Sequence, residues 1–284
     1  MVIKGEEKMN VLSLFDGMSC GQLALQRSGI QVNKYYASEI KKAAIKVTQH
    51  NFPNTIQLGD VMNSDNWNIE KPDLIIFGSP CQDLSQASRQ REGLKGSRSS
   101  LFFQAHKILN HYKPKYFLME NVGRMKEEDK NIISEMLGVH PIRINSKLVS
   151  GQLRDRNYWT NIPNVTQPED KGITFQSIIT DGYVDREKAR ALLEGEARPY
   201  ADLLKFHRRY TQTGFGNLIF SDPSFDPHKG LRLLNQLEME RLQTVPEGYT
   251  KCLSRNKAAS VLGDGWTIDV IAHIFKNIKE VNNV

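Results

Sequence analysis

The first half of the chain predicts an α/β fold, in which a Rossmann-like, mostly parallel sheet carries helices on both faces. Short runs rich in β-branched residues alternate there with helix-like stretches, which is the pattern of a parallel sheet. Glycines, carboxylates and a cysteine follow directly where these runs end. Because ligands of such sheets bind beyond the carboxyl ends of the strands, these residues are candidates for a functional site.

The expected elements follow one another regularly before residue 163 and less regularly after it. Strands are expected at residues 10–15, 34–38, 55–58, 73–77 and 116–120, and helices near 22–28, 41–50 and 101–112. Turn-forming residues become common in 164–228, where 181–196 has the composition of a solvated helix, and helical periodicity returns at 234–242 and 268–278. We therefore expect a main domain of residues 1–163 and 229–284, with a small lobe at 164–228.

The composition is that of a globular protein with a mild excess of positive charge. The 284 residues carry a formal net charge of +6, which suits a polyanionic partner. No apolar run approaches the roughly 18 residues of a membrane span, and residues 1–8 lack the apolar core of a signal peptide, so a cytoplasmic protein without membrane contact is expected. The three widely spaced cysteines argue against a disulfide framework or a zinc site, and no metal is expected.

Three strand ends carry groups that suit an adenosine-containing cofactor. The first strand runs into Phe15-Asp16-Gly17-Met18, where a glycine lets the backbone approach a nucleotide-like ligand. The phosphate-loop and dinucleotide-binding patterns are both missing, which points away from NAD. Glu39 could accept bonds from two ribose hydroxyls, and Asp60 could accept one from an adenine amino group. Each feature alone is more often a tight turn or a solvated acid.

The fourth strand ends in Gly78-Ser79-Pro80-Cys81, followed by a polar loop. A lone cysteine is usually a small buried hydrophobe. In residues 84–100, however, the sequence has four cations and the single acid Glu92, and nearby cations favour the reactive thiolate. The same cations could track a DNA backbone. They are Arg89, Arg91, Lys95 and Arg98.

The fifth strand ends in Glu120, a carboxylate that is unfavourable to bury unless it has a function. The later segment 152–156 reads Gln-Leu-Arg-Asp-Arg. Its two arginines, Arg154 and Arg156, would point the same way in an extended chain. The alternative for this segment is a solvated edge strand.

In their order, these motifs resemble those of the DNA (cytosine-5) methyltransferases. The matching segments are 15–21 for the first cofactor motif, 78–82 for the Pro-Cys loop, 120–122 for Glu-Asn-Val, 152–156 for Gln-x-Arg-x-Arg, 241–246 for Arg-Leu-Gln-x-x-Pro and 263–267 for the last motif. The resemblance covers most of the chain except 164–228 and is closest to the mammalian de novo enzymes and related prokaryotic or phage enzymes. Ile40, where many bacterial members carry an aromatic residue, and Asp264 depart from the pattern.

The resemblance implies a class I methyltransferase that moves a methyl group from S-adenosylmethionine to carbon 5 of a flipped-out cytosine and releases S-adenosylhomocysteine. Cys81 would attack ring carbon 6, Glu120 would assist at ring nitrogen 3, and Arg154 would hold the carbonyl oxygen at position 2. Arg156 would orient Glu120 or the loop. The residues expected to contact the cofactor are Phe15, Asp16, Gly17, Met18, Glu39, Ile40, Asp60, Val61, Gly78, Pro80, Asp264, Gly265 and Trp266.

Double-stranded DNA is the expected partner, and no obligate protein partner is evident. The loop 84–100 is the candidate to close over a flipped base. In the lobe, Arg208, Arg209 and Gln212 are expected to read base edges, although the arginines could instead bind only phosphate.

Two other functions fit the motifs. Methylation of cytosine in transfer RNA is one, because those relatives share nearly all of the motifs. A catalytically inactive DNA-binding homologue is the other, and the intact set of Cys81, Glu120 and Arg154 argues against it. The sequence is equally compatible with a restriction-modification enzyme, a solitary regulator and a phage enzyme that protects its own genome.

Overall fold

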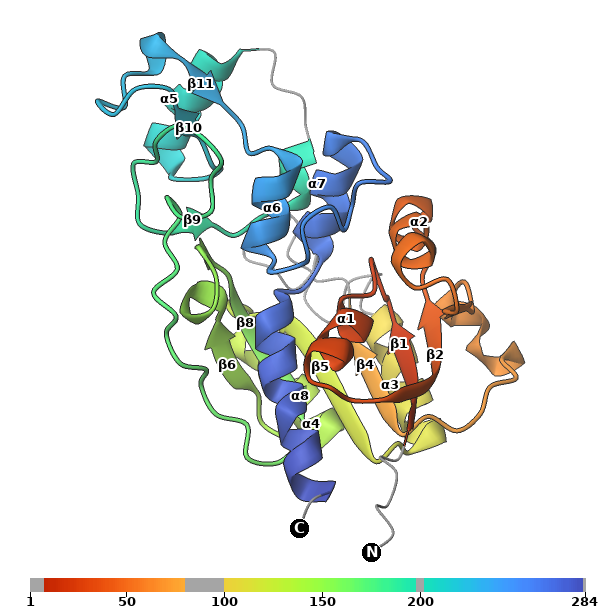
Figure 1. Cartoon of the computed structure of the whole chain (residues 1–284). Coiled ribbons are helices and arrows are strands. Elements are labelled where there is room, and N and C mark those ends of the chain that lie inside the picture. Colours follow the sequence, from red (N-terminus) through yellow and green to blue (C-terminus); the bar gives the residue numbers. More distant parts are fainter. Residues whose placement is uncertain (1–7, 80–99, 198–201, 283–284) are drawn as a thin grey trace, which may run out of the picture. The chain divides into compact units, whose positions relative to one another are not determined.

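The computed structural model describes residues 8–79, 100–197 and 202–282, and its main element is a seven-stranded sheet with the strand order β3-β2-β1-β4-β5-β8-β6 (Figure 1). The first five strands in this order are parallel to their neighbours, and β8 runs antiparallel to β5. This confirms the expected mostly parallel sheet. The strands are β1 (Met9–Leu14), β2 (Val32–Ser38), β3 (Ile56–Gln57), β4 (Leu74–Phe77), β5 (Tyr116–Val122), β6 (Ile142–Asn145) and β8 (Asp155–Thr160).

Helices cover both faces of this sheet, because successive side chains of a strand point to opposite faces. On one face, buried residues of β1, β4, β5 and β8 form a single core cluster with α3 (Ser100–Tyr112) and α4 (Glu127–Leu137). On the other face, α1 (Cys20–Arg27) lies so close that a Cβ added at Gly21 would come within 2.1 Å of the Ile76 side chain. The Ser28 hydroxyl, at the end of α1, donates to the carbonyl of Ala272 in α8 (Ile268–Asn282) at 3.1 Å.

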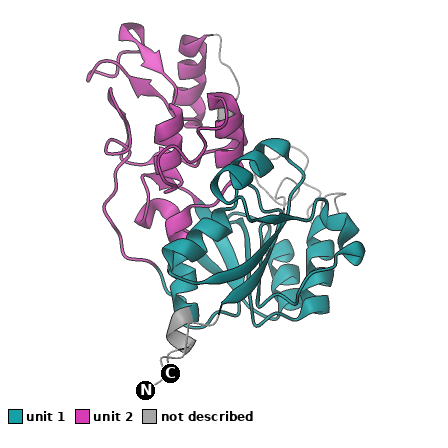
Figure 2. Ribbon diagram, turned by 45° about the vertical axis from the view of Figure 1, so that its right-hand side comes forward, with its two compact units in different colours: residues 1–144, 155–167, 271–284 teal, residues 145–154, 168–270 magenta. Residues whose placement is uncertain are grey.

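The chain divides into two compact units (Figure 2). Unit 1 comprises residues 1–144, 155–167 and 271–284 and holds almost all of the sheet, together with α2 (Lys42–Asn51). Unit 2 comprises residues 145–154 and 168–270. It therefore contains most of the expected lobe, and also segments on either side that the sequence pattern assigned to the main domain.

Unit 2 is built from short elements. Strand β7 (Gln152–Leu153) pairs in parallel with β9 (Ala189–Arg190), and β10 (Ile219–Phe220) pairs antiparallel with β11 (Leu231–Arg232). Its helices are α5 (Leu203–Thr213), α6 (Gln236–Leu242) and α7 (Arg255–Asp264), with shorter 3₁₀ turns at η4 (Ser146–Leu148), η5 (Glu194–Ala197) and η6 (Pro227–Lys229). Among the described residues, no helix is both long and apolar enough to cross a membrane.

The expectation of a solvated helix within 181–196 was wrong. This stretch contains β9, the start of η5 and turns. The Lys188 ammonium donates to the backbone carbonyls of Lys147, Ser150 and Ile173, at 2.5 to 3.2 Å. These bonds join segments far apart in the sequence, so tertiary contacts override the local composition.

Candidate functional site

The turn between β1 and α1 leaves backbone open to a ligand. Phe15, Gly17 and Ser19 all have positive φ angles, of 56°, 61° and 60°. A Cβ built on Gly17 would meet nothing within 4 Å, so the space beside this backbone is free. Gly17 donates its N–H to the Glu39 carboxylate at 2.8 Å, which fixes the turn against the end of β2.

Glu39 is held in place by backbone groups. Its other oxygen accepts from the N–H groups of Ile40 and Lys41, both at 2.8 Å. A carboxylate offers about four lone-pair sites, so these three bonds orient Glu39 and still leave capacity for a hydroxyl group. The side chain of Ile40 next to it is 68% exposed. An anchored carboxylate beside an exposed apolar side chain suits a ribose and an aromatic base.

Asp60 completes this group of strand ends in unit 1. It caps the turn η1 (Val61–Asn66), where its carboxylate accepts from the Met62 N–H at 2.9 Å. The Ser38 hydroxyl donates to the carbonyl of Gly59 at 2.8 Å, which ties the end of β2 to the segment before Asp60. Gly59 has a φ of 76° and open space where a Cβ would stand. The ends of β1, β2 and β3 therefore present two carboxylates and open backbone to one region.

Asp16 and Met18 differ from their neighbours in the first motif because both side chains are buried. The Asp16 carboxylate accepts from the hydroxyls of Ser19 and Tyr35, at 2.5 and 2.8 Å. Burial raises the pKa of Asp16 to about 6, and these hydrogen bonds oppose the rise only in part. A cofactor would therefore meet the backbone of these two residues rather than their side chains.

A second cluster forms where β4 and β5 end side by side. The pairing of Phe77 with Met119 brings Gly78 and Ser79 next to Glu120 and Asn121. The Asn121 amide donates to the carbonyl and the hydroxyl of the buried Ser79, at 3.4 and 3.3 Å. This bond pair fixes the position at which the chain enters the following segment. That segment contains Pro80, Cys81, Arg89, Arg91, Lys95 and Arg98, which all lie outside the described residues.

Glu120 forms an ion pair with Arg156 from the neighbouring strand. The Nε of Arg156 lies 2.7 Å from Oε1 of Glu120, and both side chains are largely shielded from solvent. The β5–β8 register pairs Val122 with Arg156, so the arginine is positioned to reach diagonally along the strand to Glu120. The structure therefore pairs Arg156 with Glu120, and an orienting role for Arg156 stays a prediction.

Arg154 does not share the direction of Arg156. It lies between β7 and β8 rather than within one continuous strand, so the condition under which the two side chains would point the same way is not met. Its guanidinium donates to the carbonyls of Leu192, Gly263 and Gly265, at 2.8 to 3.1 Å, and the residue is only 4% exposed. Arg154 therefore holds three backbone segments of unit 2 together.

Two buried side-chain amides, those of Gln152 and Gln243, connect three of the motif segments. The Gln152 amide donates to the carbonyl of Leu242 and accepts from the N–H of Leu192, at 2.6 and 3.0 Å. The Gln243 amide donates to the carbonyl of Leu262 at 2.6 Å and accepts from the Thr267 hydroxyl at 3.0 Å. The motif segments 152–156, 241–246 and 263–267 therefore share one network. Of the expected cofactor contacts here, Asp264 is exposed, Gly265 is buried and Trp266 is half-buried.

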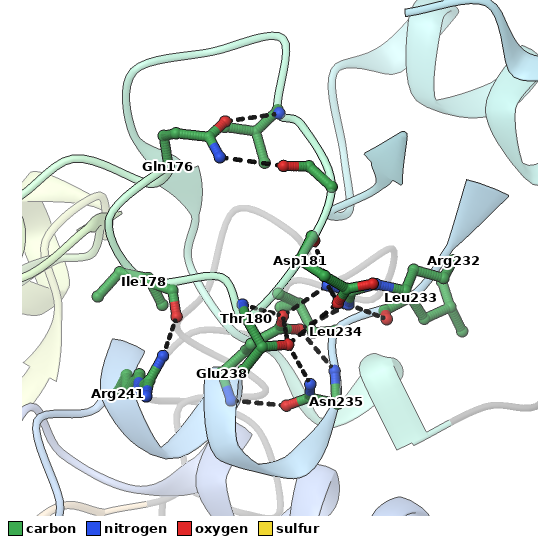
Figure 3. Close-up of polar contacts among 12 residues, drawn as sticks. Gln176, Ile178, Thr180, Asp181, Arg232, Leu233, Leu234, Asn235, Glu238 and Arg241 are labelled. Atoms are coloured by element: carbon green, nitrogen blue, oxygen red, sulfur yellow. Dashed lines mark hydrogen bonds and ion pairs between the residues drawn. The ribbon is translucent and has the colours of Figure 1, made fainter. Parts of the chain in front are cut away.

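A second network in unit 2, centred on Glu238, was missed by the sequence reasoning (Figure 3). The carboxylate of this fully buried residue accepts from the Arg232 guanidinium at 2.7 and 2.8 Å, and from the N–H groups of Thr180 and Asn235. Burial alone would raise the pKa of Glu238, but these bonds outweigh burial and lower it. The signal was present in the sequence, because Asn235 and Glu238 have the spacing of a capping box and form one at the start of α6.

The helix α5 presents the residues expected to read DNA. Phe206 and Tyr210 are buried on one side of the helix, while Arg208, Arg209 and Gln212 are exposed. The N-cap Asp202 accepts from the Lys205 N–H at 2.9 Å, so the nearest acid is engaged with the backbone. The exposed side of α5 therefore carries cations and an amide.

Solved structures show the same fold at low sequence identity. A methyltransferase of Entamoeba histolytica, EhMeth, is 16% identical with a TM-score of 0.73, and the match covers 97% of this chain and 99% of that one. A DNMT2 mutant of Spodoptera frugiperda is 18% identical with a TM-score of 0.63, over 96% of this chain and 100% of that one. Both similarities concern the fold alone.

Sequence relatives are more specific. Residues 9–139 match the family described as C-5 cytosine-specific DNA methylase. The orphan methyltransferase M.SPRI of Bacillus phage SPR is 34% identical over 94% of this chain and 59% of its own length. M.Rho11sI of Bacillus phage rho11s is 35% identical over 51% of this chain and 30% of its own length. The type II methyltransferase M.NlaX of Neisseria lactamica is 26% identical over 95% of this chain and 96% of its own length. Residues 9–139 are therefore similar to the C-5 cytosine-specific DNA methylase family.

Proposed function

We propose that this protein is a DNA (cytosine-5) methyltransferase, which transfers a methyl group from S-adenosylmethionine to carbon 5 of a cytosine in duplex DNA. One observation carries the proposal: Glu120, paired with Arg156, lies near the end of β5, and its neighbour Asn121 bonds to Ser79, two residues after β4. Cys81 follows Ser79 by two residues in the sequence and is the proposed nucleophile, and Glu120 is the proposed acid–base group. The family match and the phage and type II relatives support this function.

The ends of β1, β2 and β3 fit S-adenosylmethionine. When bound, this cofactor supplies an electrophilic methyl group on a sulfonium sulfur. Glu39 would hold the ribose hydroxyls, Asp60 the adenine amino group, and the exposed Ile40 would cover the adenine ring, with Val61 behind it. The open backbone at Gly17 gives the remainder of the cofactor room to approach. Gly78, Pro80 and the 264–266 segment remain proposed contacts.

The chemistry follows from the weak reactivity of carbon 5. The Cys81 thiolate forms a bond to ring carbon 6, and the displaced ring electrons are stabilised when Glu120 gives a proton to ring nitrogen 3. Carbon 5 then carries enough electron density to accept the methyl group. A base removes the hydrogen from carbon 5, the carbon–sulfur bond breaks to release the thiolate, and Glu120 recovers its proton. The cytosine must leave the duplex before any of these steps, because a stacked base hides its ring face.

The two arginines of the 152–156 segment take different roles in this proposal. Arg156, which pairs with Glu120, would be the cation that also binds the carbonyl oxygen at position 2 of the base. Arg154 acts on the scaffold, since three backbone carbonyls occupy its guanidinium. The proposal thus moves the contact with the base from Arg154, to which the resemblance assigned it, to Arg156.

Methyl transfer from labelled S-adenosylmethionine tests the function. We expect the label at carbon 5 of cytosine in duplex DNA and not in transfer RNA. Cys81→Ala should abolish transfer and still bind the cofactor in calorimetry, because Glu39 and Asp60 are unchanged. Only the wild type should form a covalent adduct with a duplex that contains 5-fluorocytosine.

Cys252→Ala is the matched control, because Cys252 is a half-buried cysteine of unit 2 that has no part in the proposed chemistry. It should retain the transfer rate. Normal turnover by Cys81→Ala would end the covalent mechanism, and label in transfer RNA alone would replace DNA as the substrate.

A further inference from the structure

Phe215 is an exposed aromatic residue directly after α5. Its side chain is 58% exposed, whereas Phe206 and Phe220 of the same unit are buried. A single exposed apolar side chain needs no explanation by itself. Phe215 differs because the backbone that carries it is fixed on both sides.

The glycine before Phe215 is anchored to the lobe. Gly214 ends α5 in the left-handed region with a φ of 66°, and its N–H donates to the carbonyl of Tyr210 at 2.8 Å. Its own carbonyl accepts from the guanidinium groups of Arg190 and Arg186, at 3.0 and 3.4 Å. The end of α5 is thereby bound to the β9 strand and to the segment before it.

The residues after Phe215 are fixed as firmly. Gly216 has a φ of 89°, and a Cβ there would lie 2.5 Å from the Phe206 ring, so its backbone packs directly on the core. The Asn217 side chain is fully buried, accepts from the Arg190 N–H at 2.8 Å and donates to the Arg190 carbonyl at 3.2 Å. The exposure of Phe215 is therefore built into the turn and does not come from a loose loop.

The surroundings of Phe215 suit a polyanion. The preceding helix presents Lys205, Arg208 and Arg209, and no residue of 203–213 is acidic. Cations that neutralise phosphates hold a protein on DNA but carry no sequence information. In the major groove, which admits an α-helix, the apolar feature at a base edge is the methyl group of thymine. A rigidly presented phenyl ring beside a cationic helix matches that feature.

We infer that Phe215 is a specificity-determining residue that reads a thymine through its methyl group, next to the bases contacted from α5. The inference rests on the proposed function and deepens it. It predicts that the recognition sequence contains an A·T pair at a position set by Phe215. It also predicts that the methyl group itself, and not the hydrogen-bonding edge of thymine, is what the protein recognises there.

The test replaces each thymine of a methylated site by deoxyuridine, which lacks only the methyl group. The site is first read by bisulfite sequencing of a duplex library methylated by the wild type. At one position the replacement should lower the methylation rate about fourfold, which corresponds to roughly 0.8 kcal/mol for one buried carbon. Phe215→Ala should methylate both duplexes at the same rate, accept other bases at that position and keep the melting temperature of the wild type.

Phe225→Ala is the matched control, because Phe225 is another exposed phenylalanine of unit 2, on the Asp222–Lys229 turn. It should preserve the difference between thymine and uracil. The inference is overturned if the wild type treats the two bases alike at every position, or if Phe215→Ala still separates them. In both cases cytosine methylation itself would stand, whereas a wild type that methylates no cytosine would refute the proposed function instead.

Discussion

At the scale of single residues, Arg154 and Arg156 show how two side chains of one motif are committed to different tasks. Arg154 donates hydrogen bonds to three backbone carbonyls of unit 2, while Arg156 pairs with Glu120 on the strand β5 of unit 1. The sequence spacing could not separate them, because a same-side orientation requires a continuous strand. The break between β7 and β8 falls at Arg154 itself.

We expect Arg154→Ala and Arg156→Ala to fail in different measurements. Loss of Arg154 removes three hydrogen bonds to backbone carbonyls from a buried guanidinium, so the free energy of unfolding should fall by about 3 kcal/mol. Loss of Arg156 should lower the single-turnover rate of methyl transfer by roughly 100-fold, with a smaller effect on DNA affinity, because it removes a group that acts on the base during reaction. Urea unfolding and single-turnover kinetics of both variants measure the difference.

A conservative variant of Arg154 tests whether charge alone is sufficient for its structural role. Lysine has no planar fork to serve several carbonyls, so Arg154→Lys should recover little of the lost stability. A stability of Arg154→Ala equal to that of the wild type, together with a lost reaction rate, would return Arg154 to the base-contacting role that the family resemblance implies.

At the scale of helices and strands, the sequence predicted those elements whose position depends on the local pattern of residues. The five strands and three helices expected before residue 121 were found within a few residues of their expected bounds, whereas α4, β6, β7 and β8 were not predicted. Glu39 and Asp60 follow strand ends as expected, and Glu120 lies two residues before the end of β5. The 181–196 segment could not be predicted in this way, because the bonds of Lys188 to distant carbonyls decide its path. The Glu238 network depends likewise on residues 58 positions apart.

A prediction about sequence recognition concerns the helix α5. We expect alanine at one or more of Arg208, Arg209 and Gln212 to broaden the set of methylated sites. A lost base contact should cost roughly 1–3 kcal/mol at one position of the site, whereas a lost phosphate contact should weaken binding to all sequences and reduce the salt slope by about one. Bisulfite sequencing and binding at several salt concentrations distinguish the two outcomes for each variant.

Leu204→Ala is the control for α5, because Leu204 is exposed on the same helix and offers no hydrogen bond to a base. It should leave both site preference and salt slope unchanged. If all three polar variants kept the wild-type preference, sequence readout would lie outside α5.

At the scale of the whole molecule, the two units contain buried carboxylates with opposite responses to acid. The pKa of Asp16 in unit 1 is raised from its ordinary value of 3.8 to about 6. Its contribution to stability is therefore fully present below about pH 4 and is lost as the pH rises through 6. The pKa of Glu238 in unit 2 is lowered from its ordinary value of 4.5, so its contribution is present above that value and is lost as the pH falls through the folded pKa.

Unfolding experiments between pH 4 and pH 8 should separate these contributions by difference. The stability of the wild type relative to Asp16→Asn should fall by about 2.4 kcal/mol as the pH rises from 4 to 8, since each pKa unit corresponds to 1.36 kcal/mol and part of the change lies below pH 4. The stability of the wild type relative to Glu238→Gln should change in the opposite sense and shrink as the pH approaches 4. Because the glutamine still accepts one hydrogen bond but no longer pairs with Arg232, this second difference isolates the charge of Glu238. Wild-type and variant curves that stay parallel over this range would show that neither carboxylate has a pKa altered by folding.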